Sequence, residues 1–162
     1  MFRYQDDCIV IDDDGLFAQH YEKMYPKEMV LNCTNLSPNK SNFLDLTISI
    51  YRQKFMYYSW DKRREFKFQV INYPNLSGNI PSNQSYGTYT SQLIRFCDIN
   101  MPYKYFVQDI QKLTEKFSEQ GFLLKTLKDK MVQFRKKYFF KWAKFNKDIS
   151  ESFTKIFRSC LI

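Results

Sequence analysis

The chain has 162 residues, a formal net charge of +8 and an apolar content of 44%. This length suits one ordinary domain, and this apolar content excludes wholesale disorder. The charge is uneven, because residues 1–100 hold equal numbers of basic and acidic residues, whereas residues 101–162 hold 14 Lys or Arg and 6 Asp or Glu. We therefore expect a polyanion to bind the C-terminal part of the chain.

The cysteines lie far apart in the sequence, and His20 is the only histidine. A zinc site needs clustered Cys and His ligands, so this pattern excludes one. A chain of this size with four distant cysteines needs no disulfide framework, which favours an intracellular location without separating nucleus from cytoplasm. No run of about 18 apolar residues occurs and the first residues lack a signal-peptide pattern, so we expect no membrane partner.

The first eleven residues place two adjacent carboxylates, Asp6 and Asp7, between an aromatic run and the β-branched run Cys8 to Ile11. Val and Ile favour strands, whereas Gln-Asp-Asp favours a turn, so the segment predicts a hairpin with its acidic pair at or beside the turn. Adjacent carboxylates repel each other, and a divalent cation with oxygen ligands relieves that repulsion. A solvated Asp-rich turn fits the same spacing equally well.

The rest of the chain predicts strands first and helices second, which is an α+β arrangement. Alternation and turn residues indicate strands at 29–33, 43–51 and 54–60, with a turn at 35–41 and a hairpin through Arg52-Gln53. A segment rich in Asn, Pro, Ser and Gly at 72–85 reads as a linker. Apolar residues at helical spacing predict a helix from Leu16 to just before Pro26. The same spacing, with Pro102 and Gly121 as boundary residues, predicts helices at 86–98, 103–119, 122–146 and 149–159.

The predicted helix at 122–146 carries two sets of residues at helical spacing. Lysines spaced by 7, 4 and 3 share one face, and aromatics spaced by 4, 4 and 3 share another. The lysines are Lys130, Lys137, Lys141 and Lys144, and the aromatics are Phe134, Tyr138, Trp142 and Phe145. This pattern predicts a helix that buries its aromatics while its lysines contact nucleic-acid phosphates. A solvated lysine face on a core helix gives the same pattern.

Tyr4-Gln5-Asp6-Asp7 resembles the Y-x-D-D signature of reverse transcriptases, which lies at the tip of a hairpin in the polymerase palm. The likeness continues downstream in order and spans nearly the whole chain. The segments that resemble retroelement polymerases are Asn42 to Leu46, Tyr58 to Phe68, Asn79 to Ser82, Tyr86 to Arg95, and Gln120 to Phe122 with the basic aromatic stretch after it.

This resemblance implies an RNA-directed DNA polymerase in which Asp6 and Asp7 are catalytic and bind Mg²⁺, with Mn²⁺ as an alternative. Tyr4 would lie beside the primer terminus, and Phe43, Leu44 and Asp45 would belong to the primer grip. The implied partners are an RNA template, a DNA primer and a dNTP. Two metal ions in such a site activate the primer 3′-hydroxyl and stabilise the leaving pyrophosphate.

In the family that the chain resembles, a further metal-binding Asp and the fingers precede the Y-x-D-D motif, which here begins at residue 4. We therefore expect a C-terminal piece of a polymerase that needs the upstream palm and fingers and is inactive alone. Residues 1–71 would be the end of the palm with primer-grip-like strands, 72–85 the linker, and 86–162 a helical, thumb-like region. Two other classes remain open: a non-catalytic nucleic-acid-binding module, and a structural protein with an incidental acidic turn.

Overall fold

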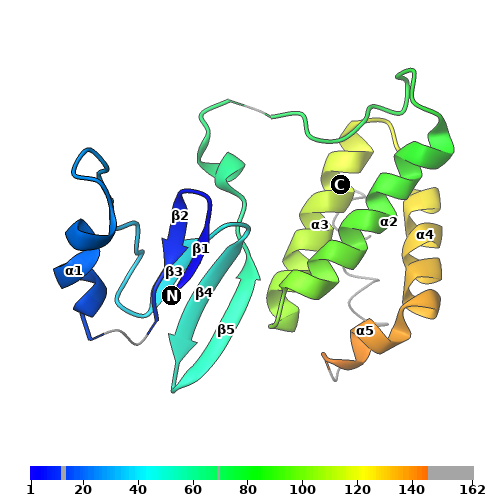
Figure 1. Cartoon of the computed structure of the whole chain (residues 1–162). Helices are drawn as coiled ribbons and strands as arrows, with labels where there is room; N and C mark the ends of the chain where they lie inside the picture. The colour runs from blue at the N-terminus through cyan, green and yellow to red at the C-terminus, as the bar shows by residue number, and fades with distance from the viewer. Residues whose placement is uncertain (12–13, 69, 146–162) are drawn as a thin grey trace.

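The computed structural model describes residues 1–11, 14–68 and 70–145 (Figure 1). Within these ranges two small antiparallel sheets precede a group of packed helices, which confirms the α+β class. The hairpin and the first helix lie on one side of the larger sheet, and the helical body lies on the other (Figure 1).

The acidic hairpin forms as the sequence predicts. Strand β1 (Phe2–Tyr4) pairs with strand β2 (Asp7–Ile9), and helix α1 (Leu16–Met24) follows. The strand expected at 29–33 does not form: Val30 is 78% exposed, and none of the described residues pairs with this segment. A short β-prone run needs a neighbouring strand to satisfy its backbone, and this run has no such neighbour in the described structure.

The larger sheet has the order β3-β4-β5, with β3 at Lys40–Phe43, β4 at Leu46–Tyr51 and β5 at Lys54–Ser59. The prediction of one strand over 43–51 is wrong, because Leu44 and Asp45 form a two-residue turn that sets Phe43 opposite Leu46. Leu44 adopts a positive φ of 54°, which Leu rarely does. The predicted turn at Arg52-Gln53 is confirmed, and both residues have the positive φ that a tight hairpin favours.

Four helices make up the second half: α2 (Ser82–Ile99), α3 (Tyr103–Glu119), α4 (Leu124–Lys137) and α5 (Phe139–Ala143). A short 3₁₀ turn, η1 (Lys62–Glu65), precedes them. The prediction for 103–119 is confirmed, whereas α2 begins four residues before the predicted 86. The single helix predicted over 122–146 is wrong, because Tyr138 leaves helical geometry between α4 and α5. The helix predicted at 149–159 lies outside the described residues.

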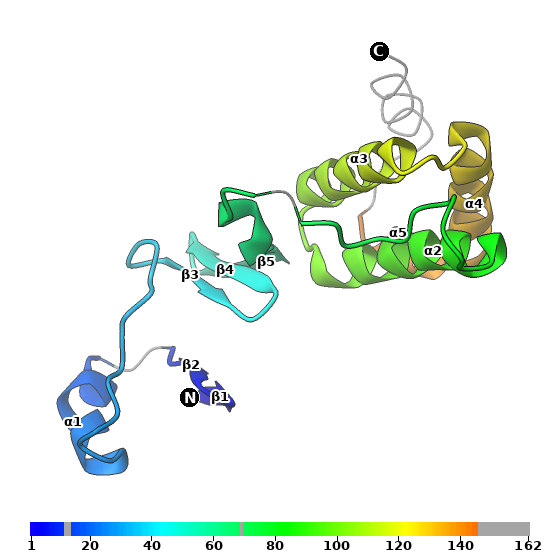
Figure 2. The same ribbon diagram turned by 90° about the horizontal axis from the view of Figure 1, so that it is seen from above.

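The hydrophobic core lies entirely among the helices. Every buried hydrophobic side chain of the described residues falls between Tyr86 and Phe145. The largest fully buried ones come from α2, α3 and α4: Tyr89, Phe106, Phe117, Phe134, Leu93, Ile110, Leu113, Leu127 and Met131. The sheet reaches this body through β5, which contacts α2 and α3, while the hairpin and α1 lie farther out (Figure 2). The helical body therefore supplies most of the hydrophobic stabilisation of the described chain.

Candidate nucleic-acid interface and acidic hairpin

The acidic hairpin presents both of its carboxylates to solvent. Asp6 lies in the turn, and Asp7 begins β2 directly opposite Tyr4. Directly opposed residues project from the same face of a hairpin, so Tyr4, which is 57% exposed, shares a face with Asp7. The turn is tied by Arg3, whose Nε donates to the Gln5 carbonyl oxygen at 2.9 Å, and Gln5 itself has a φ of 51°.

The donors at this hairpin have the right chemistry for Mg²⁺ or Mn²⁺, because hard cations prefer carboxylate oxygens. The hairpin itself supplies two such carboxylates. Across residues 1–11, 14–68 and 70–145, no three His, Cys, Asp or Glu side chains gather closely enough to hold a metal ion. Asp6 and Asp7 are therefore an incomplete ligand set within the described structure, and a complete site would need at least one further ligand.

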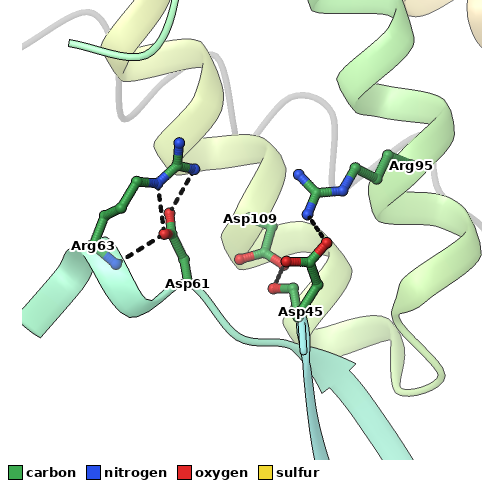
Figure 3. A network of polar contacts seen from close by, with 6 residues as sticks. Asp45, Asp61, Arg63, Arg95 and Asp109 are labelled. Atoms are coloured by element: carbon green, nitrogen blue, oxygen red, sulfur yellow. Dashed lines mark hydrogen bonds and ion pairs between the residues drawn. The ribbon is translucent and has the colours of Figure 1, made fainter. Parts of the chain in front are cut away.

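The residues expected in the primer grip lie at the turn between β3 and β4. Phe43 ends β3, Leu44 is 40% exposed at the turn, and the carboxylate of Asp45 forms an ion pair with Arg95 of α2 at 2.6 Å (Figure 3). Beside this pair, Asp61 holds Arg63 at 2.7 Å. The turn is thus anchored to the helical body, and the side chain of Asp45 contacts a cation of the chain itself.

A buried polar cluster joins β5 to the helices, and sequence reasoning missed it. Asp109 of α3 is 5% exposed and accepts hydrogen bonds from the Ser59 hydroxyl and from the Asn100 amide nitrogen, the latter at 2.9 Å. The Asn100 amide oxygen also accepts from the backbone N–H of Ser59 at 3.0 Å. Nearby, the rings of Tyr58 and Tyr105 stack with their centroids 3.8 Å apart. Only the polar character of Asp109 on an apolar helix face signals this cluster in the sequence.

The structure separates the four lysines that were expected on one helix face. Lys130 and Lys137 belong to α4, whereas Lys141 and Lys144 follow the break at Tyr138. Lys141 donates to both carboxylate oxygens of Asp98 at 2.5 and 2.6 Å, and Lys144 donates to the backbone carbonyl oxygen of Cys97. These two lysines neutralise the negative end of α2, whose own last turn carries no basic residue.

Burial shapes the chemistry of this contact between α5 and α2. The Cys97 thiol is fully buried, and this burial raises its pKa to about 11. Burial also lowers the pKa of Lys144 from its ordinary value, and the neighbouring Cys97 and Asp98 oppose that shift. A thiol with a raised pKa is a poor nucleophile, so Cys97 acts as a packing residue.

The exposed positive charge of the helical body is concentrated on α4, which holds six basic residues and one acidic residue. Its apolar side faces the core through Leu127, Met131 and Phe134. On the opposite side three exposed lysines share one face, which we call the α4 basic face: Lys125, Lys128 and Lys136. None of these three lysines was among those predicted to contact phosphates, although the positions of the core residues on the same helix would have indicated them.

Searches for similarity to models of known protein families, to curated proteins and to solved structures find no match for this chain. None of the helices in the described ranges is long and apolar enough to cross a membrane.

Proposed function

We propose that this chain is the C-terminal palm and thumb segment of a retroelement reverse transcriptase. The observation that carries the proposal is the Tyr4-Gln5-Asp6-Asp7 sequence, which closes a two-residue hairpin turn and leaves both carboxylates exposed. The ordered likeness of the downstream segments to retroelement polymerases supports it. So does the concentration of positive charge on α4, because polymerases hold their template and primer through the phosphate backbone.

In this proposal each region of the chain contributes to one task. Asp6 and Asp7 contribute ligands to a Mg²⁺ or Mn²⁺ site that an upstream carboxylate completes, and Tyr4 lies beside the primer terminus. The bound ions supply the charge stabilisation of nucleotidyl transfer to the primer 3′-hydroxyl. The turn at Phe43, Leu44 and Asp45 supports the primer strand, and the α4 basic face follows the phosphates of the RNA–DNA duplex. The chain alone binds the duplex and does not extend the primer.

The second candidate is a non-catalytic nucleic-acid-binding module, which the positive charge of α4 supports without any metal at the hairpin. Both candidates predict duplex binding that weakens with salt. They differ in whether a divalent cation at the hairpin contributes to that binding.

The test is binding of the chain to an RNA–DNA duplex across a salt series, with and without Mg²⁺. If the three lysines of the α4 basic face each contact one phosphate, log K falls with log salt at a slope of about −3. The polymerase proposal expects a Mg²⁺-dependent gain in affinity that Asp6→Asn abolishes and Asp7→Asn reduces. Asp14→Asn, which removes an exposed carboxylate outside the hairpin, serves as the matched control and should leave the gain intact.

The other outcomes assign the chain differently. Salt-sensitive binding that neither Mg²⁺ nor the two hairpin substitutions change would favour the non-catalytic module. Absence of duplex binding even at low salt would refute both candidates. Primer extension by the chain alone with Mg²⁺ and dNTPs would contradict the expectation that the upstream part is required.

A further inference from the structure

Two adjacent phenylalanines stand out from the surface where α4 ends. Phe139 is 69% exposed and Phe140 is 59% exposed, and their rings meet edge to face with centroids 6.2 Å apart. Both residues begin α5, directly after the helix break at Tyr138. Two exposed rings side by side are costly in water and mark a binding site more often than single exposed residues do.

The core does not need these two rings. The apolar side of α4 is completed by Phe134, which is buried, and by Tyr138, whose ring lies 5.2 Å from that of Phe134. The ring of Phe140 lies 6.3 Å from that of Tyr138, and neither Phe139 nor Phe140 is among the buried residues of the described core. Removing either phenylalanine side chain therefore leaves the buried cluster intact.

The segment that carries the two rings is fixed in place. Lys141 is ion-paired with Asp98, and Lys144 donates to the Cys97 carbonyl oxygen. These contacts hold α5 and the residue after it against the end of α2. The Cys97 thiol donates in return to the Lys141 carbonyl oxygen at 3.4 Å. The rings are thus held outward before any ligand binds, and such preorganisation lowers the entropic cost of binding.

Two positively charged residues directly precede the segment that carries these rings. They are Lys136 and Lys137, both exposed, and the Nζ of Lys137 lies 5.5 Å from the centroid of the Tyr138 ring. A polyanion that also carries flat apolar groups would complement both features. Single-stranded nucleic acid is such a ligand, because its bases stack on aromatic rings while lysines contact its phosphates.

A membrane surface is a weaker match for the same features. Basic helices that bind membranes need a continuous apolar face, and the apolar face of α4 is already buried in the core through Leu127, Met131 and Phe134. Helix α5 has only five residues. The two rings therefore provide sites for one or two bases and little area for insertion among lipids.

We propose that Phe139 and Phe140, together with Lys136 and Lys137, form a stacking site for the unpaired nucleotides of a single strand. This site adjoins the α4 basic face proposed for the duplex and shares Lys136 with it, but its two rings lie outside that face. It does not rest on the polymerase chemistry of the hairpin. Within a polymerase it would hold a strand that enters or leaves the duplex. Within a non-catalytic module it would be a single-strand binding site in its own right.

The experiment compares a fluorescein-labelled single-stranded oligouridine of 12 nucleotides with a blunt RNA–DNA duplex, using fluorescence anisotropy at low salt. The variant is Phe139→Leu with Phe140→Leu, which keeps apolar side chains and removes the aromatic faces. We expect its affinity for the single strand to fall roughly 10-fold or more, since stacking on each ring contributes substantially. Its affinity for the duplex should change less than about twofold, because the lysines that dominate backbone binding are unchanged. Leu123→Ala, at another exposed apolar position of the helical body, is the matched control and should bind both ligands as the unsubstituted chain does.

Three results would overturn the stacking site. The first is single-strand affinity in the double variant equal to that of the unsubstituted chain. The second is an equal loss for single strand and duplex, which would mean that the substitutions disturb the helical body; thermal unfolding followed by circular dichroism checks this directly. The third is binding to phosphatidylserine-containing vesicles without binding to oligouridine, which would assign the rings to a lipid surface. Failure of the Mg²⁺-dependent duplex test leaves this proposal standing, and failure of the stacking test leaves the duplex proposal standing.

Discussion

Replacing Asp109 by alanine tests whether the buried polar cluster holds the sheet to the helices. The substitution removes the acceptor for the Ser59 hydroxyl and for the Asn100 amide, inside a region where Asn100 is fully buried and Ser59 is 8% exposed. Each lost hydrogen bond costs about 1.5 kcal/mol when its buried partner is left unsatisfied. The free energy of unfolding should therefore fall by about 3 kcal/mol. For a chain of this length that corresponds to a melting temperature roughly 6–12 °C lower.

The measurement is urea unfolding followed by circular dichroism, with Asp129→Ala as the control because it makes the same substitution at an exposed position of α4. The control should change the free energy of unfolding by less than about 0.5 kcal/mol. Ser59→Ala and the double variant with Asp109→Ala complete a mutant cycle, in which the two sites should couple by about 1 kcal/mol. If Asp109→Ala costs no more than the control, the cluster does not join the sheet to the helices and this reasoning is wrong.

Three further predictions concern individual positions. Gly121 follows the C-cap of α3 and has a φ of +86°, so Gly121→Ala should lower the free energy of unfolding by about 1–2 kcal/mol. Gly87 lies inside α2, where an added Cβ meets nothing within 4 Å, so Gly87→Ala should raise the free energy of unfolding by about 0.5–1 kcal/mol. Urea titration of both variants checks the opposite signs. Because burial raises the pKa of the Cys97 thiol from an ordinary 9.0 to about 11, its contribution to stability is complete below pH 9 and is lost as the pH rises through 11. The decline of unfolding free energy between pH 9 and 11 should be shallower in Cys97→Ala, and an unchanged slope would contradict the assignment. Lys141→Ala removes the partly exposed ion pair with Asp98 and should lower the free energy of unfolding, measured by urea titration, by at most about 1 kcal/mol. The salt dependence of duplex binding should stay as it is in the unsubstituted chain.

Local residue patterns were sufficient for the elements that depend on neighbouring residues alone. The helix at Tyr103–Glu119 follows from apolar spacing between Pro102 and Gly121, and the structure has those bounds. The hairpin turn at Arg52-Gln53 and the acidic hairpin at Asp6 follow from strand and turn preferences in the same way. In each case the residues that determine the structure lie within a few positions of each other in the chain.

The tertiary structure decided what depends on residues far apart. Helical spacing put Lys141 and Lys144 on one face with Lys130. In the structure the helix is interrupted at Tyr138, and the two lysines beyond it bind Asp98 and the Cys97 carbonyl oxygen, more than forty residues earlier in the chain. The run at 29–33 has strand-forming residues and stays outside any sheet, because no described strand lies beside it. A spacing pattern predicts which residues can share one face of a helix. It does not predict which distant residue of the chain will contact them after folding.

The same division holds for the candidate sites. Sequence alone identified Asp6 and Asp7 and located the excess of positive charge in the C-terminal part. Only the packed helices showed that the exposed charge lies on the α4 basic face, and that Asp45 is held by Arg95. The exposure of Phe139 and Phe140 also required the fold, because helical spacing gives the angular position of a side chain and not what packs over it. The contacts of this segment with α2 are also tertiary, because the Lys141–Asp98 ion pair and the hydrogen bonds to Cys97 join residues more than forty positions apart.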